Sequence, residues 1–276
     1  MYFYKDEFID KKDLYLSPDD RGYYFGDGIY EVFRVYNGRI YEQEAHMQRL
    51  QKSASEVRID LPFTTQEIGN ILTKLVQDNG TVEGTIYMQI TRGEAPRAHP
   101  FPAGAKPVML AYCTEVKRPL ATIQGGIQAI TFEDIRWLRC DLKTLNLLPN
   151  VMAKQAALDH GVQEVVLHRG GTVTECSASN FMMIKDHVLY THPANNLILH
   201  GITRAVVLRL ARSLQIEVKE EPFTLQQLQQ ADEAFITGTT VEVTPVIGVD
   251  GTPVGSGEPG PITRKLQIEF EHTFAV

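Results

Sequence analysis

Three separate stretches of the chain carry residues that could do chemistry together. Lys143 stands in segment 140–146, whose other residues are apolar or neutral apart from Asp141. Glu175 follows a predicted strand, and Gly201-Ile202-Thr203-Arg204 predicts the start of a helix. An amine can hold an aldehyde as a Schiff base, an anion can keep a pyridine nitrogen protonated, and a helix N-terminus can bind phosphate. Pyridoxal phosphate needs all three, and the prediction depends above all on Lys143.

Each of these features also has an ordinary structural explanation. A lone lysine is usually a solvated surface charge, Glu175 could be a solvated loop carboxylate, and Gly201 could be an N-cap and nothing more. A second small and hydroxyl-rich cluster, 237–240, follows a predicted strand, where a turn could present amides and hydroxyls to the same phosphate. Because these elements occur together, the sequence favours a cofactor site.

The composition bounds the protein class. With 276 residues and 43% hydrophobic content, the chain can form one large or two medium globular domains. The formal net charge of -7 argues against nucleic acid or an anionic membrane as the main partner, so small molecules are expected. Three cysteines, far apart at positions 113, 140 and 176, predict a reducing compartment and no metal site. No signal peptide or long apolar run is evident, which favours a cytoplasmic protein.

Hydrophobic periodicity predicts an α+β first half. Strands are expected near 2–9, 28–36, 39–42, 85–91 and 108–113, with a turn at Asn37-Gly38. Apolar spacings of three and four predict a helix near 47–57, and a capping box at Thr64 begins a second helix through residue 76. Pro119 is typical of a connector, so a domain boundary is placed near residue 118.

The second half is also predicted to mix helices and strands. Helices are expected at 150–160, ended by Gly161, and at 202–214; strands are expected at 126–132, 164–168, 172–174, 181–184, 187–190, 234–236 and 246–249. The run 255–260 fits the G-x-G-x-x-G spelling of a dinucleotide site. Pro259 and Pro261 are expected to prevent a helix from opening there, so a surface loop is predicted instead.

Several motifs together resemble one known family. The motifs are Arg21-Gly22-Tyr23-x-Phe25-Gly26-Asp27-Gly28-x-Tyr30-Glu31, the Lys143 segment, Thr174-Glu175, Gly201-Ile202-Thr203-Arg204 and Thr239-Thr240-x-Glu242-x-Thr244-Pro245. Over nearly the whole chain they resemble the class IV, or fold type IV, pyridoxal phosphate aminotransferases. The resemblance implies a two-domain α+β homodimer, with domains 1–118 and 119–276 and the cofactor in the cleft between them.

The resemblance also assigns roles to the residues of the cofactor site. Lys143 would be the Schiff-base lysine and proton shuttle, and Glu175 the partner of the pyridine nitrogen. Four further residues would bind the phosphate: Arg49, Ile202, Thr203 and Thr239.

Segment 91–99 resembles the loop of the D-amino acid members of this family. In them an arginine and a histidine reach the neighbouring subunit's site and join a tyrosine to clamp the substrate carboxylate; here these are Arg97, His99 and Tyr30. This implies ping-pong transamination of D-amino acids with 2-oxo acids, with D-alanine and 2-oxoglutarate giving pyruvate and D-glutamate for bacterial cell-wall precursors.

Three alternatives stay open at this stage. An L-branched-chain aminotransferase or an aminodeoxychorismate lyase would keep Lys143 and Glu175 but lack the Arg97 and His99 clamp. A non-catalytic protein on the same scaffold would be expected to lose the lysine or the glutamate.

Ala178, Gly238 and Cys176 replace residues common among related D-enzymes, which predicts an altered preference among D-substrates.

Overall fold

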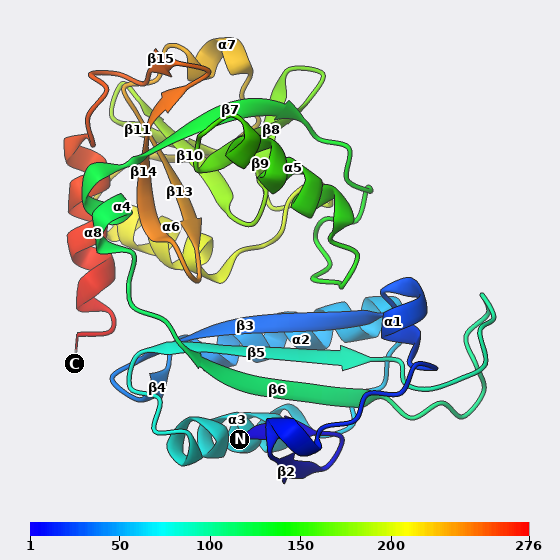
Figure 1. The fold of residues 1–276 in the computed structure, drawn as a ribbon. Coiled ribbons are helices and arrows are strands. Elements are labelled where there is room, and N and C mark those ends of the chain that lie inside the picture. The colour runs from blue at the N-terminus through cyan, green and yellow to red at the C-terminus, as the bar shows by residue number, and fades with distance from the viewer. Residues whose placement is uncertain (276) are drawn as a thin grey trace. The chain divides into compact units, whose positions relative to one another are not determined.

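The computed structural model describes residues 1–275, whose contacts divide into two compact units (Figure 1). The first unit contains Met1–Lys117 and takes in the later segment Leu142–Leu147, while the second contains Arg118–Asp141 and the chain from Leu148 onward. Both units mix helices with sheets, so the predicted α+β class is confirmed. The domain division 1–118 and 119–276 around a cofactor stays a prediction.

The first unit is built on a six-stranded sheet in the order β2-β1-β6-β5-β3-β4, with antiparallel neighbours throughout. Its strands are β1 (Tyr2–Tyr4), β2 (Glu7–Ile9), β3 (Gly28–Tyr36), β4 (Arg39–Ile40), β5 (Gly84–Thr91) and β6 (Val108–Glu115). Its helices are α1 (Arg21–Phe25), α2 (Gln43–Val57) and α3 (Thr65–Asp78), with a 3-10 helix at Lys11–Asp13. Figure 1 shows α2 and α3 covering one face of this sheet.

The alternation of side chains along β3 sets the two faces of this sheet. Phe33 and Val35 are fully buried in a core shared with Leu50 of α2 and Leu72 of α3. Because side chains alternate along a strand, Glu31 shares the helix-covered face with Phe33, and Tyr30 projects from the opposite face. The pattern that builds the core therefore also separates Glu31 from its neighbour Tyr30.

The second unit is built on a nine-stranded mixed sheet in which β14–β7, β7–β8 and β11–β12 pair in parallel. Its strands are β7 (Ile127–Glu133), β8 (Glu164–Arg169), β9 (Thr172–Cys176), β10 (Asn180–Lys185), β11 (Val188–Thr191), β12 (Val218–Glu220), β13 (Glu233–Gly238), β14 (Glu242–Val249) and β15 (Thr252–Pro253). Its helices are α4 (Leu120–Gly125), α5 (Leu148–Asp159), α6 (Ile202–Ser213), α7 (Leu225–Leu228) and α8 (Pro261–His272).

The expectation that no helix opens at Pro261 is wrong. Helix α8 begins at that residue, because proline at the first helical position loses an amide that has no helical partner anyway. The buried Glu233 carboxylate accepts the next two amides, from Ile262 at 3.0 Å and Thr263 at 2.8 Å. These donors are already engaged, so the preceding glycine-rich turn is a helix entry and not a dinucleotide site. None of the helices among residues 1–275 is both long enough and apolar enough to span a bilayer.

Candidate active site

Lys143 is held against the beginning of β3 in the first unit. Its carbonyl accepts the Tyr30 amide at 3.1 Å, and the Leu145 amide donates to the Gly28 carbonyl at 3.0 Å. The Lys143 Nζ lies 4.1 Å from the centroid of the Tyr30 ring, a geometry that favours a cation over an aromatic face. The backbone pairing therefore places a primary amine beside a phenol.

Glu31, on the opposite face of β3, forms a buried cluster with two residues of α2. Arg49 donates to its carboxylate through Nε at 2.8 Å and Nη2 at 2.6 Å, and His46 Nδ1 lies 2.7 Å from Oε2. Burial alone would raise the pKa of Glu31, but Arg49 and His46 outweigh it and lower that pKa to about 2. Burial lowers the pKa of His46. The sequence analysis named Arg49 but missed its partners, although His46 and Arg49 are one helical turn apart.

Arg97 and His99 lie on an exposed loop that α1 supports. The Arg97 guanidinium lies 5.1 Å from the centroid of the Phe25 ring, and the His99 ring lies 5.6 Å from the same centroid. Arg21 donates through Nη1 to the Ala98 carbonyl at 2.6 Å and thereby holds the loop backbone. The chain therefore brings Tyr30 to Lys143 but seats Arg97 and His99 on Phe25.

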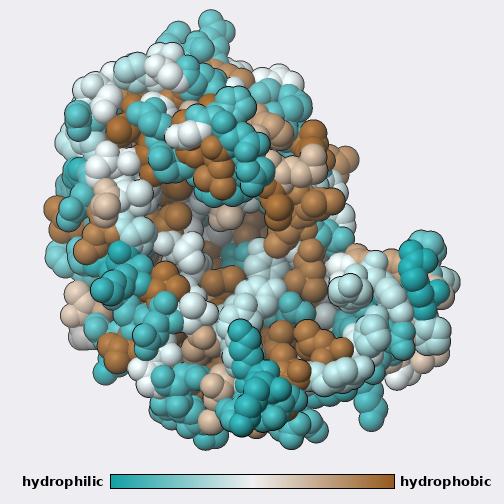
Figure 2. All heavy atoms as spheres, in the orientation of Figure 1, coloured by the Kyte–Doolittle hydropathy of each residue, from teal (hydrophilic) through white to brown (hydrophobic). Residues whose placement is uncertain are grey.

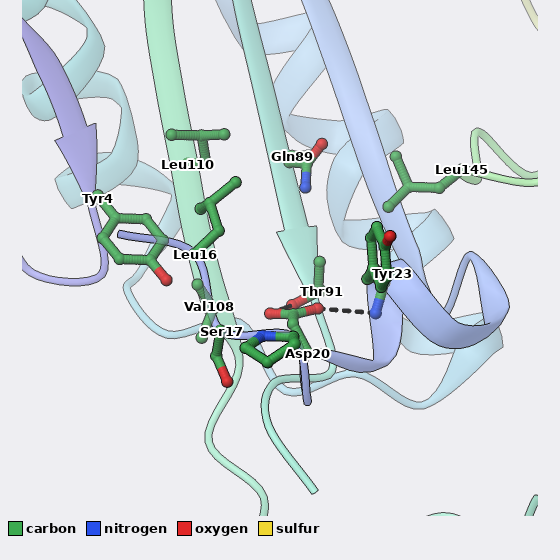
Figure 3. Close-up of a pocket in the computed structure, with 12 residues that line it drawn as sticks. Tyr4, Leu16, Ser17, Asp20, Tyr23, Gln89, Thr91, Val108, Leu110 and Leu145 are labelled. Atoms are coloured by element: carbon green, nitrogen blue, oxygen red, sulfur yellow. Dashed lines mark hydrogen bonds between the residues drawn. The ribbon is translucent and has the colours of Figure 1, made fainter. Parts of the chain in front are cut away.

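A cavity of about 550 Å³ also lies in the first unit, between the sheet and segment 16–23 (Figure 3). Two of its lining residues adjoin the Lys143 region: Leu145 is close in the chain, and Gln89 is the cross-strand partner of Tyr30. Asp20 shapes the wall, because its carboxylate accepts the Gly22 amide at 2.7 Å and the Thr91 hydroxyl at 2.8 Å. The predicted clamp residues Tyr30, Arg97 and His99 are absent from the lining identified among residues 1–275.

Glu175, at the end of β9 in the second unit, is a buried carboxylate surrounded by donors. It accepts the Leu199 amide at 3.1 Å, the Asn180 side-chain amide at 2.9 Å and Nη1 of Arg136. Burial raises the pKa of Glu175, and Arg136 opposes this rise most strongly. The explanation of Glu175 as a solvated loop carboxylate is therefore wrong. Arg136 was not among the predicted site residues, because it lies 39 residues before Glu175 in the chain and no local pattern links the two.

The N-terminus of α6 lies next to Glu175 through Asn180. A Cβ built on Gly201 would meet Asn180 Oδ1 at 2.0 Å, so glycine allows this close approach. The helix has no side-chain cap at Gly201, which leaves its first amides, at Ile202 and Thr203, for another acceptor. Asn180 therefore contacts both the Glu175 carboxylate and Gly201, the residue just before α6.

Two buried hydroxyl groups in this region could donate hydrogen bonds to a phosphate. Ser179 Oγ and Thr237 Oγ1 are buried and have no hydrogen-bond partner among residues 1–275. Thr237 is the cross-strand partner of Asn180, and Ser179 lies against Gly238, just before Thr239. Buried hydroxyls normally find partners, so these residues fit a phosphate that would accept from them. The second unit therefore offers Glu175 for the pyridine nitrogen of pyridoxal phosphate, and the α6 amides and these hydroxyls for its phosphate.

Comparison with known proteins agrees with this chemistry. The family model described as "Amino-transferase class IV" matches residues 28–249. A D-alanine aminotransferase of Staphylococcus haemolyticus is 48% identical over 269 residues, which cover 97% of this chain and 95% of that protein.

Solved structures of class IV enzymes share the fold. The branched-chain amino acid aminotransferase of Escherichia coli is 27% identical, with a TM-score of 0.93 over 99% of this chain and 94% of that one. A branched-chain amino acid aminotransferase from T.th., solved with pyridoxamine 5'-phosphate, is 28% identical, with a TM-score of 0.90 over 99% and 94% of the two chains. The chain therefore belongs to the class IV aminotransferases and is a pyridoxal phosphate-dependent enzyme.

Proposed function

We propose that this enzyme transfers amino groups between D-amino acids and 2-oxo acids, with D-alanine and 2-oxoglutarate giving pyruvate and D-glutamate. The observation that carries the proposal is the seat of the Lys143 amine on the Tyr30 ring, 4.1 Å from its centroid. Identity of 48% to a D-alanine aminotransferase over nearly the full chain supports the substrate class. The three cysteines of this chain are free thiols, which supports a location in the reducing cytoplasm.

The proposed roles divide between the two units. Bound pyridoxal phosphate supplies an aldehyde that carries the amino group and a pyridine ring that accepts electrons. Lys143 of the first unit would hold the aldehyde and move the substrate α-proton through Nζ. Glu175 of the second unit would accept the hydrogen bond of the protonated ring nitrogen. We propose that both serve one cofactor, bound between domains 1–118 and 119–276.

The phosphate would be held by backbone amides and by side-chain donors. The amides of Ile202 and Thr203 at the start of α6 and the Thr239 hydroxyl would donate to it. Arg49 would add a positive charge from α2, while Glu31 keeps its guanidinium fixed. This arrangement would orient the ring so that Lys143 works on one face only, which selects one substrate enantiomer.

The substrate carboxylate would be clamped by Tyr30 together with Arg97 and His99 of a neighbouring copy. Guanidinium grips a carboxylate in two places, and imidazole and phenol add directional donors. The seating of Arg97 and His99 on Phe25 of their own chain leaves their polar ends on an exposed loop, which supports a role toward another subunit.

Exposed apolar side chains support a homodimer. In the second unit they include Trp137 and Leu138 (62% exposed) in one segment, and Leu148 (70% exposed) and Val151 near the start of α5. Figure 2 shows apolar patches interspersed among hydrophilic ones on the visible face. Large exposed apolar groups close together are typical of surfaces that a partner covers.

A second candidate function is L-branched-chain transamination, which the TM-score of 0.93 to the Escherichia coli enzyme favours. The fold alone does not choose between the two, because one fold hosts several substrate classes. The sequence identity of 27% to that enzyme, against 48% to the D-alanine aminotransferase, favours the D-substrate.

The test is amino transfer to 2-oxoglutarate from D-alanine, L-alanine and L-leucine in parallel, followed by the keto acid product and by the chirality of the glutamate. D-alanine turnover that yields D-glutamate is expected. Turnover of L-leucine with L-glutamate as product would establish the second candidate and reject the proposed clamp.

A further inference from the structure

Glu175 does not stand alone in the second unit; it ends a chain of buried charges. Arg136 contacts Glu175 through Nη1 and binds Asp134 through Nε at 2.9 Å and Nη2 at 2.8 Å. One guanidinium therefore bridges two carboxylates. Its orientation is over-determined, because a bidentate ion pair fixes the plane of the fork and thus the direction of the remaining Nη1.

Asp134 is in turn saturated with donors. Its side chain is fully buried, and it accepts the Arg136 amide at 3.1 Å, the Arg169 Nε at 3.1 Å and the Thr174 hydroxyl at 2.9 Å. Thr174 directly precedes Glu175 on β9. The same aspartate therefore fixes both the arginine that contacts Glu175 and the strand residue next to it.

The charges around Glu175 leave Arg136 as its main counter-charge. Arg136 is the largest influence that opposes the burial of Glu175, while Asp134 acts in the other direction. The nearby thiols of Cys140 and Cys176 have pKa values raised by burial, so they are neutral at neutral pH. Without Arg136, the buried Glu175 carboxyl would face neutral thiols and the Asp134 carboxylate, and it would take up a proton.

We infer that Arg136, held by Asp134, is a positioning residue that keeps Glu175 ionised and aimed for the cofactor's ring nitrogen. The inference rests on the proposed role of Glu175. It adds that this role depends on the ion pair between Arg136 and Asp134, which lies behind Glu175. A protonated Glu175 could no longer stabilise a protonated pyridine nitrogen, so loss of Arg136 would resemble loss of Glu175.

A double-mutant cycle tests this, with the dissociation constant of pyridoxal phosphate as the readout. Glu175→Gln, Arg136→Gln and the double variant are each titrated with the cofactor, and the melting temperature of each apoprotein is recorded. Arg136→Gln alone is expected to weaken cofactor binding by about tenfold or more. In the Glu175→Gln background the same change is expected to alter binding less than about twofold.

Two further variants separate positioning from general destabilisation. Arg136→Lys keeps a positive charge without the fork and is expected to recover part of the affinity. Arg264→Gln removes an α8 arginine that donates to the Ile123 carbonyl, and it is expected to leave cofactor affinity unchanged. Should Arg136→Gln fail to fold, Arg136→Lys takes its place in the cycle, with a smaller loss of affinity in the parent background and the same expectation of less than about twofold in the Glu175→Gln background.

The outcomes distinguish this inference from the proposed function. Additive losses in the double variant would overturn the inference while leaving the role of Glu175 intact. Equal cofactor affinity of Glu175→Gln and the parent would reject the role of Glu175 and the inference with it. D-alanine turnover by the parent, measured separately, would still establish the reaction in either case.

Discussion

Lys143 and Tyr30 are joined twice: the Tyr30 amide donates to the Lys143 carbonyl at 3.1 Å, and the Lys143 Nζ lies 4.1 Å from the Tyr30 ring centroid. A phenylalanine at position 30 would keep the contact between the ring and the Lys143 amine, and it would lose only the proposed hydrogen bond from the hydroxyl to the substrate. Tyr30→Phe is expected to lower kcat/KM for D-alanine by about tenfold, the cost of one hydrogen bond to a charged group, with cofactor affinity unchanged.

The matched control for Tyr30→Phe is Tyr87→Phe on the next strand. Tyr87 lies 5.9 Å from Tyr30 between ring centroids, and its hydroxyl donates to Gln89 at 2.9 Å. This control is expected to leave kcat/KM within about twofold of the parent. Equal losses in the two variants would mean that the Tyr30 hydroxyl acts through sheet packing and not through the substrate.

Mixing two inactive variants tests whether Arg97 works in the neighbouring site. Lys143→Ala lacks the amine but keeps the loop, and Arg97→Gln lacks the guanidinium but keeps the amine. If the loop acts in trans, a mixed dimer contains one complete site, so an equal mixture co-expressed in one cell is expected to recover roughly a quarter of the parent activity. No recovery, with mixed dimers verified by mass spectrometry, would place Arg97 in its own subunit's site.

Local signals predicted much of the fold because they act within a few residues. The expected strand 28–36 coincides with β3, and the capping box at Thr64 is present, because alternation and capping are read from neighbouring residues. The helix predicted at 202–214 begins at Ile202 as expected. By contrast, α8 was missed because proline was judged only as a helix breaker.

The charged partners of the site could not be predicted from local patterns. Arg136 and Glu175 are 39 residues apart in the chain, and Arg49 and Glu31 are 18 apart. Such pairs form only when the sheet and its helices pack, and no periodicity records which carboxylate meets which guanidinium. Burial is also decided by packing, which is why Glu175 was compared with a solvated loop residue.

The buried Glu31 predicts a specific dependence of stability on acid. Its folded-state pKa of about 2 lies below the ordinary value of 4.5, so its contribution is complete above pH 4.5 and is lost as the pH falls toward about 2. Glu31→Gln is expected to lower the free energy of unfolding at pH 7 by about 3 kcal/mol or more. The gap between variant and parent should narrow at lower pH in urea titrations; a gap that stays constant down to about pH 3 would contradict the assignment.

The cap of α3 predicts a smaller loss. The Thr64 hydroxyl accepts the Glu67 amide at 3.2 Å, and the Glu67 carboxylate accepts the Thr64 amide at 2.8 Å. Thr64→Ala is expected to cost about 1 kcal/mol of unfolding free energy, and Thr64→Ser to cost much less, because serine keeps the hydroxyl. Urea denaturation of the three proteins checks this, and an equal loss for serine would point to the methyl group instead.

Gly201 tests the link between the helix start and Glu175. A Cβ at this position would lie 2.0 Å from Asn180 Oδ1, and Asn180 donates to Glu175 at 2.9 Å. The Gly201 backbone is in the extended region, with φ of -66°, so alanine brings no dihedral strain, and the clash alone must displace Asn180. Gly201→Ala is therefore expected to weaken pyridoxal phosphate binding by about tenfold. Gly125→Ala is the control, because a Cβ there meets nothing within 4 Å. If both alanine variants bind the cofactor as the parent does, Asn180 can move away without disturbing Glu175, and the close approach at Gly201 serves packing only.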